Sequence, residues 1–374
     1  MSAVQAGIKA KDRLDLALIY SETPAVTAAV FTQNIFIAAP LIVTKRNLAK
    51  SNHRMRAVIV NSGNANAATG DAGLKAAEQC VDVLARKLGC APHEVIVSST
   101  GVIGRPLPAQ TILDAIPALV EELLPTNIEH VARAIMTTDT VPKIATGEVG
   151  EQGGVHIAGV AKGAGMIHPD MATMLAFVMT DAAISQPELD KALRYAVQHS
   201  FNSISVDGDT STNDMVVVMA NGASGIEVDP VAFGEKLRIL CTELATAIVR
   251  DGEGASKFVE FTIEGAPTEE AARTIGRTIA RSPLVKTAIH GADPNWGRIV
   301  GAIGNAGVAL DSDRVDIYIG GILITQDNLE EARGKLLERE IQIRVVLHSG
   351  KSSARIWTCD LSAEYIHINA DYTT

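Results

Sequence analysis

The segment that covers residues 162–182 constrains this chain more than any other part of its sequence. It reads KGAGMIHPDMATMLAFVMTDA, with two glycines and a proline upstream of Thr173 and an apolar run after it. The glycines and the proline suit a bent backbone that holds a peptide bond under strain. Ala172 has no bulk to shield its carbonyl group from the Thr173 hydroxyl. The sequence therefore predicts a cleavage site between Ala172 and Thr173.

Thr173 also fits the role of a catalytic nucleophile. A threonine hydroxyl is a weak nucleophile, but an N-terminal threonine has an α-amine with a pKa of roughly 7.7–8.0 that can take the hydroxyl proton. Cleavage would create that amine and leave an α chain of residues 1–172 and a β chain of residues 173–374. Without its context, a threonine is better interpreted as an ordinary strand residue. The surrounding motif, KGAGMIHPDMATML, favours the nucleophile instead.

Composition restricts the partners and the compartment. The chain has 374 residues, of which 47% are hydrophobic, enough for one large domain or two lobes. A net charge of −10 argues against nucleic acid or an anionic membrane as a partner. No run reaches the roughly 18–20 apolar residues of a membrane span, and the N-terminus has no signal pattern. The four cysteines form no CxxC pair and have no metal-ligand spacing, so we expect a cytoplasmic protein without a metal site.

Strand and helix patterns recur in both halves of the chain. Apolar runs rich in β-branched residues predict strands at 55–63, 94–100, 213–220, 314–324 and 340–350. Helical spacing predicts helices at 71–89 and 229–251, and Ser185 with Glu188 forms a capping box that opens a third. There is no repeat and no Pro/Ser-rich linker. The pattern indicates an α/β or α+β class but does not select a topology.

At this point the chain is recognisable by a series of motifs. It closely resembles the glutamate N-acetyltransferase (ornithine acetyltransferase) family of arginine biosynthesis, whose members cleave themselves before the threonine of an MATML segment. The motifs are AGIKAKDRLDLALI, NSGNANAATG, SSTGVIG, MTTDTVPK, FNSISVDGDTSTND, RDGEGASKF, SPLVKTAIHGADPNWGRI and YIHINADYTT. They span nearly the whole chain in the family's order. The resemblance implies an α+β fold of N-terminal-nucleophile type, with central sheets sandwiched between helical layers, in which the α and β chains form one catalytic unit.

The resemblance also implies the reaction. The family moves an acetyl group from N-acetylornithine to glutamate and produces ornithine and N-acetylglutamate. Amide-to-amine exchange is nearly balanced in free energy, so it needs a covalent relay that excludes water and no activated donor. We expect ping-pong kinetics through acetyl-Thr173, no cofactor, and an α2β2 heterotetramer. Whether acetyl-CoA is a second donor stays open at this point.

The family match places functional roles on several residues. Thr100 and Gly101, at the end of the strand EVIVSST, would form the oxyanion hole. Lys162 in KGAG suits a substrate carboxylate and Glu253 in GEGAS suits the positive end of ornithine, although a lone charge is most often a solvated surface residue. The substrate contacts implied by the match are Thr137, Lys162, Thr173, Glu253, Asn369 and Thr374.

Two other interpretations stay open. The nearest is a hydrolase or aminopeptidase with the same self-generated nucleophile, which would pass its acyl group to water. A non-catalytic protein of the same fold would be expected to have lost Thr173 or the Thr100–Gly101 pair, and both are present. For residues 293–298, DPNWGR, we expect a buried turn held by Asp293 and Arg298.

Overall fold

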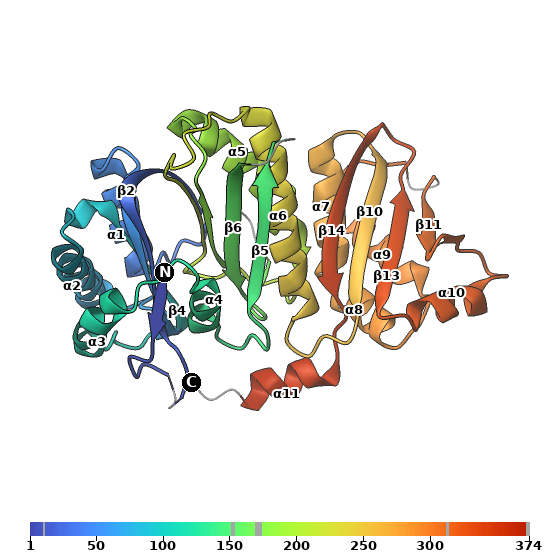
Figure 1. The fold of residues 1–374 in the computed structure, drawn as a ribbon. Coiled ribbons are helices and arrows are strands. Elements are labelled where there is room, and N and C mark those ends of the chain that lie inside the picture. The colour runs from blue at the N-terminus through green and yellow to red at the C-terminus, as the bar shows by residue number, and fades with distance from the viewer. Residues whose placement is uncertain (10–11, 151–153, 169–173, 312–313, 372–374) are drawn as a thin grey trace. The chain divides into compact units, whose positions relative to one another are not determined.

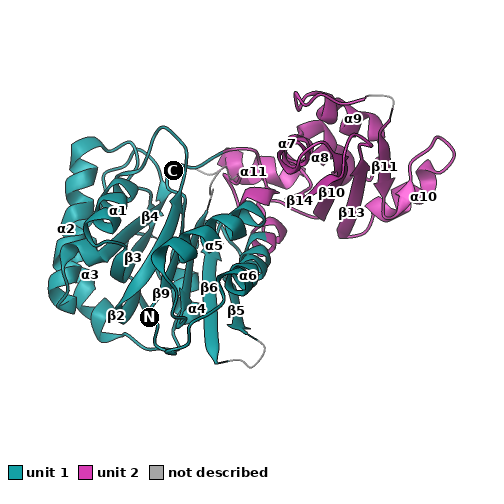
Figure 2. Ribbon diagram, turned by 90° about the horizontal axis from the view of Figure 1, so that it is seen from above, with its two compact units in different colours: residues 1–163, 170–201, 210–245 teal, residues 164–169, 202–209, 246–374 magenta. Residues whose placement is uncertain are grey.

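The structure is a computed structural model that describes residues 1–9, 12–150, 154–168, 174–311 and 314–371. The chain forms two compact units, coloured separately in Figure 2. Unit 1 contains residues 1–163, 170–201 and 210–245, and unit 2 contains residues 164–169, 202–209 and 246–374. The division between the units does not follow the predicted cleavage site, because residues from both sides of position 173 belong to each unit.

Unit 1 is built on an eight-stranded sheet. Its strands run in the order β4-β3-β2-β9-β7-β6-β5, and β1 pairs with β2. The elements of this unit are β1 (Ser2–Val4), β2 (Leu16–Phe31), α1 (Ala39–Lys50), β3 (Arg54–Asn64), α2 (Gly70–Leu88), η1 (Pro92–Glu94), β4 (Val95–Val102), α3 (Ala109–Glu121), α4 (Ile128–Ile135), β5 (Lys143–Val149), β6 (Val155–Lys162), β7 (Leu175–Thr180), α5 (Gln186–Gln198), β9 (Met215–Ala220) and α6 (Pro230–Arg250), which continues into unit 2.

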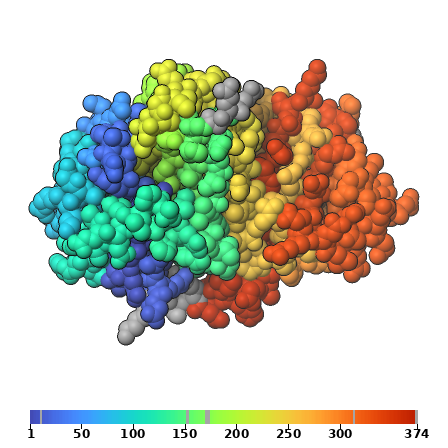
Figure 3. Space-filling view, viewed as in Figure 1, coloured from blue at the N-terminus to red at the C-terminus, as the bar shows by residue number. Residues whose placement is uncertain are grey.

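Helices cover both faces of this sheet. Along β3, Ala57 and Ile59 join a core formed with α2 and α3, while Val58 and Val60 join a second core formed with α4. This alternation follows from the two-residue period of a strand, which points successive side chains to opposite faces. The space-filling view shows α2 and α3 at the surface, in blue-green shades (Figure 3). The expected sandwich of a central sheet between helical layers is therefore present in unit 1.

Strands from both sides of residue 173 share the sheet of unit 1. β9 pairs antiparallel with β2 and parallel with β7, and β7 pairs antiparallel with β6 (Figure 1). Because β2 and β6 precede residue 173 and β7 and β9 follow it, cleavage there would leave two fragments joined through main-chain hydrogen bonds of one sheet.

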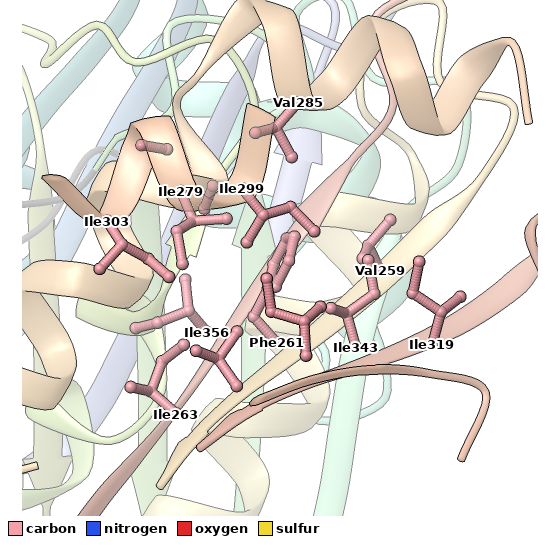
Figure 4. Packing of buried hydrophobic residues seen from close by; sticks show 14 of the residues in the cluster. Val259, Phe261, Ile263, Ile279, Val285, Ile299, Ile303, Ile319, Ile343 and Ile356 are labelled. Atoms are coloured by element: carbon pink, nitrogen blue, oxygen red, sulfur yellow. The ribbon is translucent and has the colours of Figure 1, made fainter. Parts of the chain in front are cut away.

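Unit 2 has a six-stranded sheet with the order β12-β11-β13-β10-β14-β8. Its elements are η2 (Phe201–Ser203), of which Phe201 belongs to unit 1, β8 (Ile204–Ser205), β10 (Phe258–Ala266), α7 (Glu269–Ala280), α8 (Pro283–His290), α9 (Trp296–Gly304), β11 (Asp316–Ile319), β12 (Ile322–Leu323), α10 (Leu329–Leu336), β13 (Glu340–Val346), β14 (Ser352–Cys359) and α11 (Ala363–Asp371). Figure 4 shows the core of this unit, where strand residues such as Phe261 and Ile343 pack against Ile279 of α7 and Ile299 of α9.

Most of the predicted elements are present, and the differences have local causes. The run 314–324 was expected as one strand but forms two, because Gly320 and Gly321 adopt positive φ angles of 57° and 86° and turn the chain into a hairpin. Helix α5 begins next to Ser185 as predicted, but without the capping box. The Ser185 hydroxyl donates to the Glu188 carboxylate (2.6 Å) instead of accepting from the backbone.

The segment 293–298 is not the buried turn that we expected. Asp293 is exposed and accepts a hydrogen bond from Asn295. Arg298, at the start of α9, donates to the carbonyl oxygen of Leu284 (2.8 Å) and to the hydroxyl of Thr287. The segment thus links α9 to α8 at the surface of unit 2.

A buried carboxylate holds the N-terminal loop of unit 1. Asp15 is fully buried, and its oxygens accept the backbone N–H groups of four consecutive residues, 6–9, at 2.6–3.0 Å. Lys9 then donates from Nζ to the carbonyl oxygen of Met136 (2.7 Å). Burial lowers the pKa of Lys9 to about 8. The loop is thereby fixed beside the segment that carries Thr137.

Replacement of Asp15 by asparagine tests this anchor. The amide NH2 group of Asp15→Asn would face backbone donors, so we expect the free energy of unfolding to fall by about 2–4 kcal/mol in urea titrations. Asp12→Asn is the matched control, because Asp12 is exposed on the same loop and asparagine tolerates its positive φ of 67°. Equal stability of the two variants would contradict the anchor.

Candidate active site

The end of β4 has a backbone that only glycine can adopt. Gly101 has a φ of 130°, and a Cβ atom placed on it would lie 2.3 Å from the carbonyl carbon of Gly63. At the same point the pairing of β3 with β4 becomes irregular, because Asn64 lies opposite both Thr100 and Val102. The Thr100–Gly101 pair therefore sits at a bulge, where main-chain groups can leave the sheet's hydrogen-bond ladder.

Lys162 lies beside Thr100 in unit 1. Its ammonium group, at the end of β6, donates a hydrogen bond to the Thr100 hydroxyl oxygen at 3.1 Å. Because the hydroxyl oxygen accepts from a cation, its own hydrogen can be donated to a third group, and the added positive charge makes it a better donor. The structure thus brings together two residues that the sequence assigned to separate tasks, the oxyanion hole and substrate binding.

Asp139 connects Lys162 with Thr137. One carboxylate oxygen accepts from the Lys143 ammonium (2.7 Å) and from the backbone N–H of Gly163 (2.6 Å), and the other accepts from the backbone N–H of Thr137 (2.9 Å). Burial by itself would raise the pKa of Asp139, but the charges of Lys143 and Lys162 and the hydrogen bonds from Lys143 and Gly163 outweigh it and lower the pKa to about 2. The carboxylate is therefore charged at any physiological pH and fixes the backbone next to both candidate substrate contacts.

Glu253 and Asn369 meet in unit 2. The amide nitrogen of Asn369, on α11, donates to the Glu253 carboxylate at 2.9 Å. The backbone N–H of Glu253 donates to the carbonyl oxygen of Ala164 (2.9 Å), and a Cβ atom on Gly165 would lie 2.4 Å from a Glu253 carboxylate oxygen. A side chain at position 165 would therefore displace the Glu253 carboxylate from this position.

Three predicted residues lie outside the described residues: Ala172, Thr173 and Thr374. The other six are described. Thr100, Gly101, Thr137 and Lys162 belong to unit 1, and Glu253 and Asn369 belong to unit 2. Within unit 1, Lys162 donates directly to Thr100, and Asp139 accepts from the backbone N–H groups of Thr137 and of Gly163, the residue after Lys162.

Sequence reasoning missed two buried acids near these residues. One is Asp139. The other is Asp214, the residue directly before β9. Burial raises the pKa of Asp214 well above its usual range, and its Oδ2 atom has no hydrogen-bond partner among the described residues. The next backbone N–H, that of Met215, donates to the carbonyl oxygen of Met174 (3.0 Å), which directly follows Thr173. Both acids lie in the matched motifs MTTDTVPK and FNSISVDGDTSTND, and this was the available signal.

The described part of the chain contains no group of three or more His, Cys, Asp or Glu side chains that could hold a metal ion. Among its helices, none is both long enough and apolar enough to cross a membrane.

The fold of this chain is similar to that of a solved structure from Bacillus halodurans, described as the crystal structure of arginine biosynthesis bifunctional protein ArgJ. The two are 44% identical with a TM-score of 0.51, and the match covers 52% of this chain and 98% of the solved chain.

Curated relatives match over the full length. Two proteins named arginine biosynthesis bifunctional protein ArgJ, from Geobacter sulfurreducens and Dehalococcoides mccartyi, are each 47% identical to this chain. Both matches cover 100% of this chain; they cover 98% of the Geobacter protein and 95% of the Dehalococcoides protein. A family model described as the ArgJ family matches residues 1–374. The chain therefore belongs to the ArgJ family of arginine biosynthesis enzymes.

Proposed function

We propose that this protein transfers the acetyl group of N-acetylornithine to glutamate through an acetyl ester on Thr173, after the chain has cleaved itself between Ala172 and Thr173. The observation that carries the proposal is the hydrogen bond from the Lys162 ammonium to the Thr100 hydroxyl, next to Gly101 at the bulged end of β4. A polarised hydroxyl and the backbone N–H of a glycine therefore lie next to each other at one strand end, as the stabilisation of an oxyanion requires.

Maturation is the first reaction. The Thr173 hydroxyl attacks the Ala172 carbonyl carbon, the C–N bond breaks, and the nitrogen takes the hydroxyl proton, so that an ester joins the two residues. Water then hydrolyses the ester and leaves a carboxylate on Ala172 and a free hydroxyl and α-amine on Thr173. The same amine becomes the general base for the transfer reaction.

Transfer repeats this chemistry on the substrate. The Thr173 hydroxyl attacks the acetyl carbonyl carbon, and its proton passes through the α-amine to the departing amine of ornithine. Glutamate then attacks the acetyl ester and restores the hydroxyl. Each half passes through a tetrahedral oxyanion, for which Thr100 and Gly101 are the proposed donors. In the same proposal acetyl-CoA is a second donor, since its thioester carbonyl is open to the same attack.

The comparison with the solved relative supports cleavage. Its chain is matched almost completely by 52% of this sequence and is therefore about half as long as this protein. A fragment produced by cleavage near the middle has that length, and position 172 lies near the middle of this chain.

Two charged residues of the matched motifs suit the proposed substrates. Lys162 would hold the α-carboxylate and Glu253, oriented by Asn369, would hold the positive end of ornithine. Thr137 and Thr374 would complete the contacts with the substrate. Water lacks both charged groups and would bind such a site poorly, which favours transfer over the hydrolase alternative. We further propose an α2β2 heterotetramer in the cytoplasm that needs no cofactor and no metal ion.

The first test combines mass spectrometry with initial rates. Wild type should purify as residues 1–172 and 173–374 and give parallel double-reciprocal lines when acetylornithine and glutamate are varied, because a ping-pong enzyme releases one product before the second substrate binds. Thr173→Ala should remain one inactive chain. Intersecting lines, or ornithine release at the same rate without glutamate, would reject the relay and favour direct transfer or hydrolysis respectively.

The second test concerns the Thr100 hydroxyl. Thr100→Val keeps the shape of the side chain but removes the donor, so kcat should fall by roughly 10²–10³-fold with little change in KM. Thr100→Ser, which keeps a hydroxyl for Lys162, should stay within about tenfold of wild type.

Processing must be measured in both Thr100 variants before their kinetics are compared, because cleavage passes through its own oxyanion. Rates are therefore expressed per mole of cleaved enzyme. If Thr100→Val raises KM and leaves kcat unchanged, Thr100 binds the ground state and is not part of the oxyanion hole.

A further inference from the structure

Residues 164–168, which lead into the proposed cleavage site, are held by unit 2. The chain up to residue 163 and the segment that begins at residue 170 both belong to unit 1, so this stretch is a short part of unit 2 that lies between two parts of unit 1 in the sequence. The residues of unit 2 that contact it come from positions after 173. Cleavage would therefore turn these contacts into contacts between two fragments.

Asp207 holds the middle of the stretch. Its two carboxylate oxygens accept the backbone N–H groups of Met166 (2.6 Å) and Ile167 (2.8 Å), and the Tyr365 hydroxyl donates to the same carboxylate (3.3 Å). The backbone N–H of Val206 donates to the carbonyl oxygen of Ile167 (2.7 Å). Ile167 is thus fixed at both its main-chain groups.

Met166 shows that the stretch is held against its own preference. Its φ is 56°, in the left-handed region, which costs a non-glycine residue of order 1–3 kcal/mol unless its surroundings impose it. The side chain is 44% exposed, so it is not held by tight packing. The hydrogen bonds from the N–H groups of Met166 and Ile167 to Asp207 hold the backbone in this conformation.

His168, the last described residue before the cleavage site, is held by two side-chain contacts. Its Nε2 lies 3.0 Å from the Arg277 guanidinium, which can only donate, so Nε2 is the acceptor and Nδ1 carries the hydrogen toward the Ser205 hydroxyl (3.0 Å). Burial and the charges of Arg277 and Arg281 lower the pKa of His168 to about 3, which keeps the ring neutral. Ser205 is in β8, which pairs with β14, so the anchor is part of the sheet of unit 2.

We propose that Asp207 and Arg277 are positioning residues for self-cleavage, which act by holding residues 166–168, the last described residues before the cleavage site. The inference rests on the proposed cleavage. Attack requires the two reacting atoms within about 3–3.5 Å, and a displacement of about 1 Å can cost 10²-fold in rate. On the other side of the bond, within unit 1, the Met174 carbonyl oxygen accepts a hydrogen bond from the Met215 N–H.

The experiment follows the full-length chain in a cell-free synthesis, with intact mass spectrometry after translation is stopped. Asp207→Ala and Arg277→Met should each slow the conversion to two fragments, Asp207→Ala by ~10²-fold. Asp209→Ala is the matched control, because Asp209 is an exposed acid on the same loop whose side chain has no hydrogen bond to residues 164–168. It should cleave at the wild-type rate.

A second readout separates positioning from a general loss of structure. Asp207→Asn keeps one acceptor oxygen and should cleave at an intermediate rate. Its cleaved fraction should transfer acetyl groups with a kcat within about twofold of wild type per mole of cleaved enzyme. Wild-type cleavage rates in Asp207→Ala would overturn the proposal, and so would a kcat that falls in proportion to the cleavage rate. If wild type itself does not cleave, the proposed function fails instead.

Discussion

The carboxylate of Asp139 accepts three hydrogen bonds in the interior of unit 1, and the local geometry of the candidate site depends on them. One donor is the backbone N–H of Thr137, a proposed substrate contact, and another is that of Gly163, which follows the proposed contact Lys162. The third is the buried ammonium of Lys143. A buried carboxylate without such partners would be strongly disfavoured, so the pair and its backbone donors form together or not at all. The hydrogen bond from Gly163 to Asp139 holds the backbone next to Lys162, whose ammonium group donates to the Thr100 hydroxyl.

Other aspartates along the chain also accept hydrogen bonds from several backbone N–H groups. Asp15 accepts from the N-terminal loop, and Asp207 accepts from the segment before the cleavage site. Asp360 accepts from Ser256 and Lys257, just after Glu253. Each of these segments lacks a partner strand and so has free backbone donors, which must be satisfied if they are buried. A single carboxylate satisfies several such donors at once and so holds a loop in place.

Much of the fold could be predicted from the sequence, but its connections could not. The β-branched runs at 55–63 and 213–220 became β3 and β9, whereas the pairing of β2 with β9 joins segments so far apart that no local pattern indicates it. The prediction of one strand over residues 314–324 was wrong because Gly320 and Gly321 turn the chain there, and a pair of adjacent glycines is a turn signal that the apolar pattern did not outweigh. The motifs singled out Thr100 and Lys162, which the structure joins by a hydrogen bond, while their catalytic and binding roles stay predictions. The motifs contain Asp139 and Asp214 as well, but nothing in them indicates that these acids are buried, because an acid in a polar segment has the same sequence pattern whether it is exposed or buried.

The central claim is that Thr173 carries the acetyl group between the two substrates. The most direct measurement is the intact mass of the two fragments after brief incubation with N-acetylornithine alone, followed by addition of glutamate. The account predicts that the fragment beginning at Thr173 gains the mass of one acetyl group, that the label maps to the Thr173 hydroxyl, and that glutamate removes it as N-acetylglutamate. An enzyme that turns over with neither fragment acetylated, or with the label on another residue, would contradict the account.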